Sequence, residues 1–104
     1  MPELNDKTFD AAISAAPLAV VDFFATWCGP CKMLAPILES VEKETEGVEF
    51  FRIDVDQAPE LSRRFGIMSI PTLVFLKNGE EVTRTLGVQR KPELTAKIAE
   101  LKAR

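Results

Sequence analysis

The stretch that decides how this chain folds is Trp27-Cys28-Gly29-Pro30-Cys31, which contains its only two cysteines. An apolar run typical of a β-strand ends just before this stretch, and a pattern typical of an α-helix begins within it. At a helix start, unpaired backbone N–H groups and the positive end of the helix dipole favour a thiolate over a thiol. The thiolate is the form that attacks disulfides. We therefore expect the pair to cycle between dithiol and disulfide.

Composition limits the class of protein. The chain has 104 residues, which predicts one domain spanning residues 1–104. Its formal net charge of −3 argues against nucleic acid or an anionic membrane as the main partner. No apolar run approaches the roughly 18–20 residues of a membrane span. We expect a monomer that binds neither nucleic acid nor membrane.

The residue types also indicate a compartment and exclude some mechanisms. The opening residues, 1–5, lack the basic and apolar regions of a secretory signal. Two cysteines in such a chain suggest a reducing compartment, so we expect a cytoplasmic location. The chain has no histidine, which removes any Cys-His or Ser-His mechanism.

Hydrophobic periodicity predicts an alternating order of elements along the chain. Asn5 is expected to cap a first helix, and a short strand at 2–4 is possible before it. Strands are predicted at 18–25, 48–55, 72–76 and 82–86, the last two joined by a tight Asn-Gly hairpin turn. Helices are predicted at about 28–45, from Pro59 to Gly66, and from Pro92 onward. This order predicts an α/β sandwich whose mixed sheet has four to five strands flanked by four helices.

The predicted helix at 28–45 gives the two cysteines different surroundings. At about 100° per residue, Cys31 falls on the apolar stripe of Leu34 and Leu38, whereas Cys28 falls outside it. We expect Cys28 to be reachable and Cys31 to be covered. That asymmetry suits a mechanism in which Cys28 attacks a target disulfide and Cys31 then releases the reduced target. Pro36 should kink this helix, either as a tolerated bend or for a functional reason.

Two other uses of the cysteine pair are poorly supported. A zinc site needs about four ligands, and the chain offers two cysteines and no histidine. A structural disulfide across so short a loop would constrain the unfolded chain little.

Over essentially its whole length the sequence resembles the thioredoxin family. The resemblance rests on the active-site segment at 21–33, with its C-G-P-C core, and on several shorter matches. These matches are Ala35-Pro36-Ile37-Leu38, Asp54-Val55-Asp56, Gly66-Ile67, Ser69-Ile70-Pro71-Thr72, Lys77-Asn78-Gly79 and Gly87. The combination of C-G-P-C, a later I-P-T and an aspartate in the preceding strand is highly specific to this family.

The resemblance implies a thioredoxin fold and a redox-active, cytoplasmic protein-disulfide reductase, an oxidoreductase of electron transport and cell redox homeostasis. It implies Cys28 as nucleophile, Cys31 as resolving thiol and Pro71 as a cis-proline. It further implies disulfide-containing protein substrates, no bound cofactor or metal, and reduction by a thioredoxin reductase. Two positions depart from the family pattern: Phe24 stands where many members carry tryptophan, and Arg52 where many carry lysine.

Asp22 lies in the predicted strand that precedes the cysteines, among Val20, Val21, Phe23 and Phe24. A carboxylate in that position is expensive to bury, and burial raises the pKa of an acid. The resemblance implies that Asp22 acts as a base that helps Cys31 lose its proton. The alternative is a buried acid paired structurally, with Arg52 as a candidate partner.

The resemblance also predicts a flat apolar surface around Cys28 that receives the substrate. An extended segment of the target would pair with backbone beside Pro71, as an added strand. From the sequence alone, Trp27 could equally be a core residue and Gly87 could simply end the last strand. The residues assigned to this surface are Trp27, Gly29, Pro30, Ile70, Pro71, Gly87 and Val88.

Three functional classes follow from these observations. The first is a general protein-disulfide reductase, which the Gly29-Pro30 dipeptide and the absent secretory signal favour. The second is an oxidase or isomerase of the same chemistry. The third is a binding subunit that holds a partner on this face without redox turnover, which the presence of both cysteines disfavours.

Overall fold

Five strands and four helices alternate along the chain, and the computed structural model describes all residues from 1 to 104. The predicted order is confirmed, including the short first strand. Element boundaries differ from the predicted ones by a few residues. The elements are β1 (Glu3–Leu4), α1 (Phe9–Ser14), β2 (Leu18–Phe24), α2 (Gly29–Lys43), β3 (Glu49–Asp54), α3 (Pro59–Arg64), β4 (Thr72–Lys77), β5 (Glu80–Leu86) and α4 (Lys91–Ala103).

The strands form one mixed sheet in the order β1-β3-β2-β4-β5. Strand β3 is parallel to both β1 and β2, while β4 runs antiparallel to β2 and to β5. Strand β2 is therefore central, with a parallel neighbour on one side and an antiparallel neighbour on the other. The predicted mixed sheet flanked by four helices is confirmed, with five strands.

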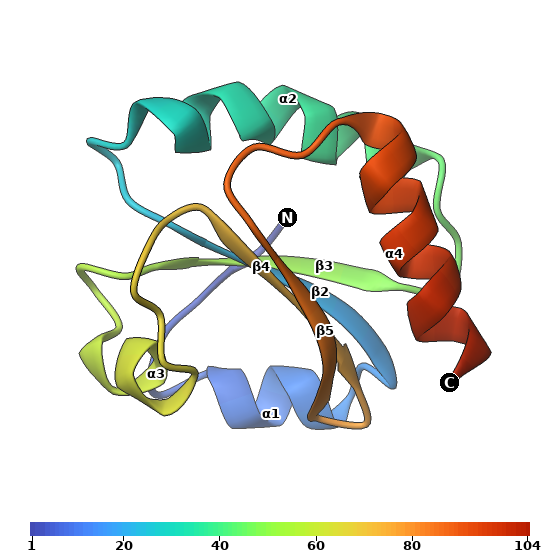
Figure 1. The fold of residues 1–104 in the computed structure, drawn as a ribbon. Helices are drawn as coiled ribbons and strands as arrows, with labels where there is room; N and C mark the ends of the chain where they lie inside the picture. The colour runs from blue at the N-terminus through green and yellow to red at the C-terminus, as the bar shows by residue number, and fades with distance from the viewer.

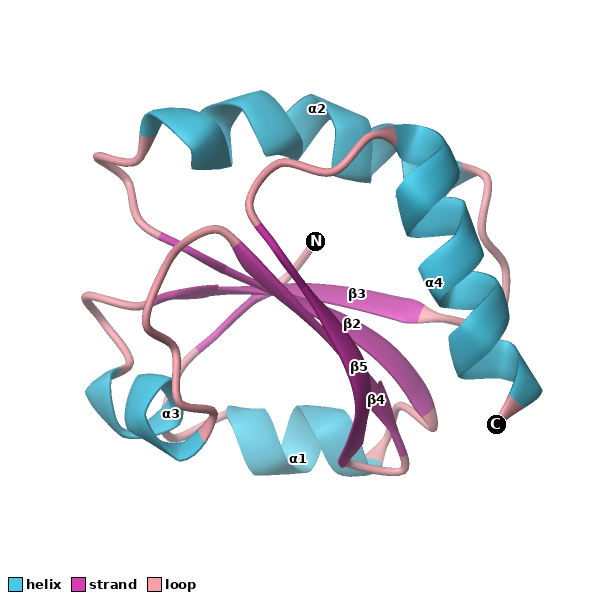
Figure 2. Cartoon of the chain, viewed as in Figure 1, coloured by secondary structure: helices cyan, strands magenta, loops and turns pink.

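The helices form a layer on each face of the sheet, with α2 and α4 on one side and α1 and α3 on the other (Figures 1 and 2). The side chains of β2 alternate between these layers, as expected for a strand. Ala19, Val21 and Phe23 belong to the core beneath α1 and α3. Val20 belongs to the core beneath α2 and α4. Asp22 therefore faces the α2 layer.

Helix α2 carries the cysteines and is anchored by one buried stripe. Leu34 and Leu38 are buried, as predicted, Val41 extends their stripe, and Cys31 continues it toward the helix start. Pro30 lies in the first turn, where its missing N–H removes no helical bond. Pro36 is also contained within the helix.

The first helix begins later than its predicted cap. The Asn5 side chain accepts hydrogen bonds from the backbone N–H groups of Lys7 and Thr8 at 2.8 and 3.1 Å. It thereby closes the turn before α1, whose own first residue is Phe9. Asn5 thus caps that turn instead of the helix.

The β4–β5 hairpin has the turn that its sequence predicts. Asn78 and Gly79 both have positive φ, 50° and 83°, as a type I′ turn requires. Such turns match the right-handed twist of the strands, and glycine adopts this conformation without steric cost. The Asn-Gly pair therefore sets the register of the edge strand β5.

We predict opposite effects on stability for two glycine-to-alanine changes. Gly79→Ala should destabilise the protein by about 1 kcal/mol, since an L side chain at positive φ is strained. Gly29→Ala should be neutral or stabilising by up to about 1 kcal/mol, because Gly29 is helical and an added Cβ would meet nothing. Urea melts of the oxidised proteins measure both effects. Equal losses for the two variants would contradict this account.

Candidate active site

The cysteines lie where the central strand passes into a helix. The β2–α2 and β3–α3 loops both leave the sheet at the same end, at the left of Figure 1. A disulfide joins Cys28 and Cys31 across the start of α2, with the two Cα atoms 5.3 Å apart. The pair therefore occupies the N-terminal end of a 15-residue helix, where the helix dipole is positive.

Cys28 caps this helix with its own sulfur. Its backbone is extended, with φ −89° and ψ 112°, and its Sγ accepts a hydrogen bond from the Cys31 backbone N–H at 3.2 Å. The same sulfur lies 3.9 Å from the carbonyl oxygen of Ile70. A charged Sγ at this position would be stabilised by the N–H donor and by the helix dipole.

The predicted difference in exposure between the cysteines is wrong for this oxidised state. Cys28 is 4% exposed and Cys31 is 5% exposed. The helical periodicity failed because Cys28 is the extended cap residue and is not part of the helix, so its side chain folds back over the first turn. The two cysteines form a small buried cluster with Phe24 and Ala25, and Val55 and Ile70 pack against that cluster.

The two cysteines nevertheless have different neighbours. Cys28 contacts Ile70, whereas Cys31 borders a cavity of about 230 Å³ between β2, β3 and α2. Asp22 and Arg52 also line that cavity. Its complete lining is Met1, Asp22, Phe24, Ala25, Thr26, Cys31, Lys32, Ala35, Glu39 and Arg52.

Burial governs the chemistry of Asp22. The residue is 3% exposed, and desolvation raises the pKa of its carboxyl to about 6, with Arg52 opposing the shift. The carboxyl is not in an ion pair with Arg52, and its Oδ1 has no hydrogen-bond partner. The ion pair between Asp22 and Arg52 that the sequence left open is therefore absent. The Asp22 carboxyl, with its raised pKa, lines the same cavity as Cys31.

Trp27 lies on the surface next to the disulfide. Its side chain is 68% exposed, which excludes the core position that the sequence left open. The indole Nε1–H donates to Asp56 Oδ2 at 2.8 Å. The sequence analysis did not assign Asp56 to the site. Its position just after β3 could have indicated that it lies near Trp27, which follows the neighbouring strand β2. Ends of neighbouring parallel strands meet at one edge of a sheet.

The other residues assigned to the substrate surface surround the cysteines. The Ile70–Pro71 peptide bond is cis, as the family resemblance implied. Gly87 follows the end of β5, and its N–H donates to the Pro71 carbonyl at 2.8 Å, so it both ends the strand and touches the site. Gly29, Pro30 and Val88 are exposed, Ile70 is half-buried and Pro71 is buried.

A shallow apolar hollow of about 220 Å³ extends this surface beyond Trp27. Met68, with 97% of its area exposed, stands at its rim. The sequence offered no periodic signal for this loop. The lining residues are Trp27, Val55, Ser62, Ile67, Met68, Ser69 and Ile70.

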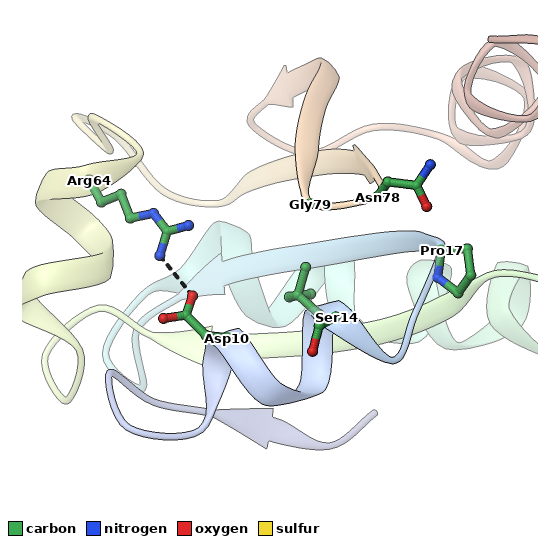
Figure 3. A pocket seen from close by; sticks show the side chains of 7 residues that line it. Asp10, Ser14, Pro17, Arg64, Asn78 and Gly79 are labelled. Carbon is green, nitrogen blue, oxygen red and sulfur yellow. Dashed lines mark hydrogen bonds and ion pairs between the residues drawn. The ribbon is translucent and has the colours of Figure 1, made fainter.

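A separate cavity of about 340 Å³ lies away from the cysteines, between α1, the end of α3 and the β4–β5 turn (Figure 3). Its only basic side chain, Arg64, is paired with Asp10 at 3.0 Å. No cysteine lines this cavity.

None of the helices in the structure is long and apolar enough to cross a bilayer. No group of three or more acidic, cysteine or histidine side chains is placed to hold a metal ion.

Comparison with known proteins gives a consistent result. The thioredoxin family model matches residues 1–100. A thioredoxin of Alicyclobacillus acidocaldarius is 43% identical over 99 residues, covering 94% of each chain. A thioredoxin of Listeria monocytogenes is 46% identical over 93 residues, covering 88% of this chain and 89% of that protein. The crystal structure of chloroplastic thioredoxin z superposes with a TM-score of 0.87 at 33% identity, covering 100% of this chain and 96% of the other.

A mixed sheet that presents a C-x-x-C disulfide at a helix start defines a thiol–disulfide oxidoreductase. The chain has the thioredoxin fold and belongs to the thioredoxin family. Its function is that of a protein-disulfide reductase.

The raised pKa of Asp22 predicts a pH-dependent loss of stability. Below the unfolded-state pKa of about 3.9, the carboxyl is protonated in both states and carries no penalty. As pH rises toward the folded pKa of about 6, the unfolded state loses its proton first and the free energy of unfolding falls. Above pH 6 the penalty levels off at about 3 kcal/mol, at about 1.4 kcal/mol per pKa unit.

Asp22→Asn should therefore stabilise the oxidised protein at pH 7, by up to about 3 kcal/mol, and should not stabilise it at pH 3.5. Denaturant melts of both proteins between pH 3.5 and 8 measure the difference. A variant that is less stable at pH 7 would mean that the native carboxylate has a stabilising partner.

Proposed function

We propose that Cys28 and Cys31 reduce disulfides of many protein substrates, with Asp22 as the base for the second step. The observation that supports this most directly is the placement of both cysteines at the start of α2, with Cys31 bordering the cavity that Asp22 lines. The Cys28 sulfur caps the helix, and Cys31 shares a cavity with the buried acid.

In the first step, the Cys28 thiolate attacks one sulfur of the substrate disulfide. A new S–S bond forms between Cys28 and the substrate, the substrate S–S bond breaks, and the departing thiolate takes a proton from water. The Cys31 backbone N–H and the helix dipole stabilise the Cys28 thiolate before the attack.

In the second step, Asp22 takes the proton of the Cys31 thiol through their shared cavity. The Cys31 thiolate attacks Cys28 Sγ, the bond from Cys28 to the substrate breaks, and the second substrate thiolate leaves and is protonated. The substrate gains two electrons and two protons, and the protein is left as the disulfide. A carboxyl with a pKa of about 6 is a suitable base near neutral pH.

The substrate binds on the surface formed by Trp27, Gly29, Pro30, Ile70, Pro71, Gly87 and Val88. Ile70 lies outside the strands and takes part in none of the backbone hydrogen bonds of the loops and turns. Its backbone groups are therefore available to an extended substrate segment that adds as a short strand. A shallow surface of this kind suits many targets.

A thioredoxin reductase is the proposed partner that returns the oxidised protein to the dithiol, as membership of the thioredoxin family implies. We further propose that the protein works as a monomer in the cytoplasm, where reduced thiols persist.

The roles of the cysteines predict different defects for two serine variants. Cys28→Ser should lower the reduction of a disulfide-linked protein substrate to the rate of the reductant alone, because no attacking thiolate remains. Cys31→Ser should accumulate a covalent adduct with the substrate, because nothing resolves it. Non-reducing gels and mass spectrometry detect the adduct. An adduct with Cys28→Ser but none with Cys31→Ser would reverse the two roles.

If the substrate binds on this surface, a charge added within it should lower activity more than the same charge added elsewhere. Val88→Glu should lower kcat/KM for a protein substrate about tenfold, a change of about 1.4 kcal/mol, by placing a charge where apolar contact is needed. Ala103→Glu adds the same charge at the exposed end of α4 and serves as the matched control. Equal activities of the two variants in a turnover assay would place the binding surface elsewhere.

A further inference from the structure

Arg52 and Asp22 are direct neighbours in the sheet, yet they do not pair. The two residues are opposite each other in the parallel register of β2 and β3, so their side chains share one face. No contact between them qualifies as an ion pair. The Arg52 guanidinium carbon instead lies 3.8 Å from the centre of the Phe24 ring.

Phe24 is well placed to hold that guanidinium. It is two residues beyond Asp22 on the same strand, and therefore on the same face, and its ring is buried. A planar guanidinium stacks on an aromatic face with a favourable electrostatic term. The stack directs Arg52 along the strand toward Phe24 and away from the carboxyl beside it.

The stack leaves two buried polar atoms without partners. Asp22 Oδ1 and Arg52 Nε are both buried and make no hydrogen bond. Both residues line the cavity that Cys31 also borders. A direct pair would have satisfied these atoms with each other, since a guanidinium and a carboxylate match in geometry.

We propose that Phe24 is a positioning residue. Its ring holds the Arg52 guanidinium near the Asp22 carboxyl but prevents a hydrogen bond between them, so that one carboxyl oxygen stays unpaired and available to Cys31. The consequence for the step in which Cys31 releases the substrate rests on the proposed base role of Asp22. The effect of Phe24 on the pKa of Asp22 does not depend on that role.

Without the aromatic ring, Arg52 is free to turn onto Asp22. A hydrogen-bonded guanidinium favours the charged form of a carboxyl and lowers its pKa. The other charged groups around the cavity are Lys32 and Glu39 on α2 and the Met1 amino group, which pairs with Glu42. Arg52 is the one whose charge shifts the pKa of Asp22.

The test is a titration of Asp22 in the oxidised protein, where neither cysteine titrates, by carboxyl ¹³C NMR of aspartate-labelled samples. Phe24→Leu should lower the Asp22 pKa by about half a unit or more, roughly threefold in the acid constant. Phe24→Trp keeps an aromatic face and should leave the pKa near its native value. If Phe24→Leu does not fold, Phe24→Met also removes the ring, and its flexible side chain can fill the space that the ring leaves.

The Arg52→Met background separates positioning from simple hydration. If Phe24 acts through Arg52, Phe24→Leu should change the Asp22 pKa far less in Arg52→Met than in the native background. An equal fall in both backgrounds would mean that the substitution only admits water, and the inference would be overturned. No fall in the native background would overturn it as well.

A kinetic measurement distinguishes this inference from the proposed function. The rate at which Cys31 resolves a preformed mixed disulfide should show a pH midpoint that falls in Phe24→Leu together with the Asp22 pKa. If the pKa falls and the kinetic midpoint does not, Phe24 still positions Arg52, but Asp22 is not the base.

Discussion

The structure depends on burying strand β2 on both faces and both edges. Its backbone is paired with β3 on one side and β4 on the other, and six of its seven residues are buried. Such a strand is held rigidly, and the loop that follows it starts from a fixed point. The disulfide is attached to that point, so its position relative to the sheet is set by main-chain hydrogen bonds and core packing.

The same burial creates the chemistry of the site. Asp22 lies inside this strand, and the alternation of side chains places it toward α2, beside a cavity of which half the lining residues are hydrophobic. Desolvation raises its pKa, and the protein is less stable for it at neutral pH. An acid whose pKa is raised by burial, beside the cavity that Cys31 borders, marks a candidate functional site.

Much of this fold could be predicted from the sequence, because its patterns are local. The apolar run of β2, the Asn78-Gly79 turn and the apolar stripe of α2 each follow from spacing and backbone preference. The exposure of Cys28 could not be predicted, since a cap residue does not follow helical periodicity.

Contacts between distant segments were equally out of reach. The bond between Trp27 and Asp56 and the stacking of Arg52 on Phe24 join residues about 30 positions apart. Their partners become neighbours only when β2 and β3 pair. The sequence marked Phe24 and Arg52 as unusual for the family, but the meaning of the two departures is visible only in their contact.

The near-complete burial of both sulfurs has a consequence for selectivity among reductants. A thiol must approach a disulfide along the S–S axis, and each of the two cysteines exposes 5% of its surface or less to solvent. A protein that docks on the surrounding surface would supply binding energy to displace this cover. Burial of the disulfide would in this way favour reaction partners that bind the surface over thiols that only collide with it.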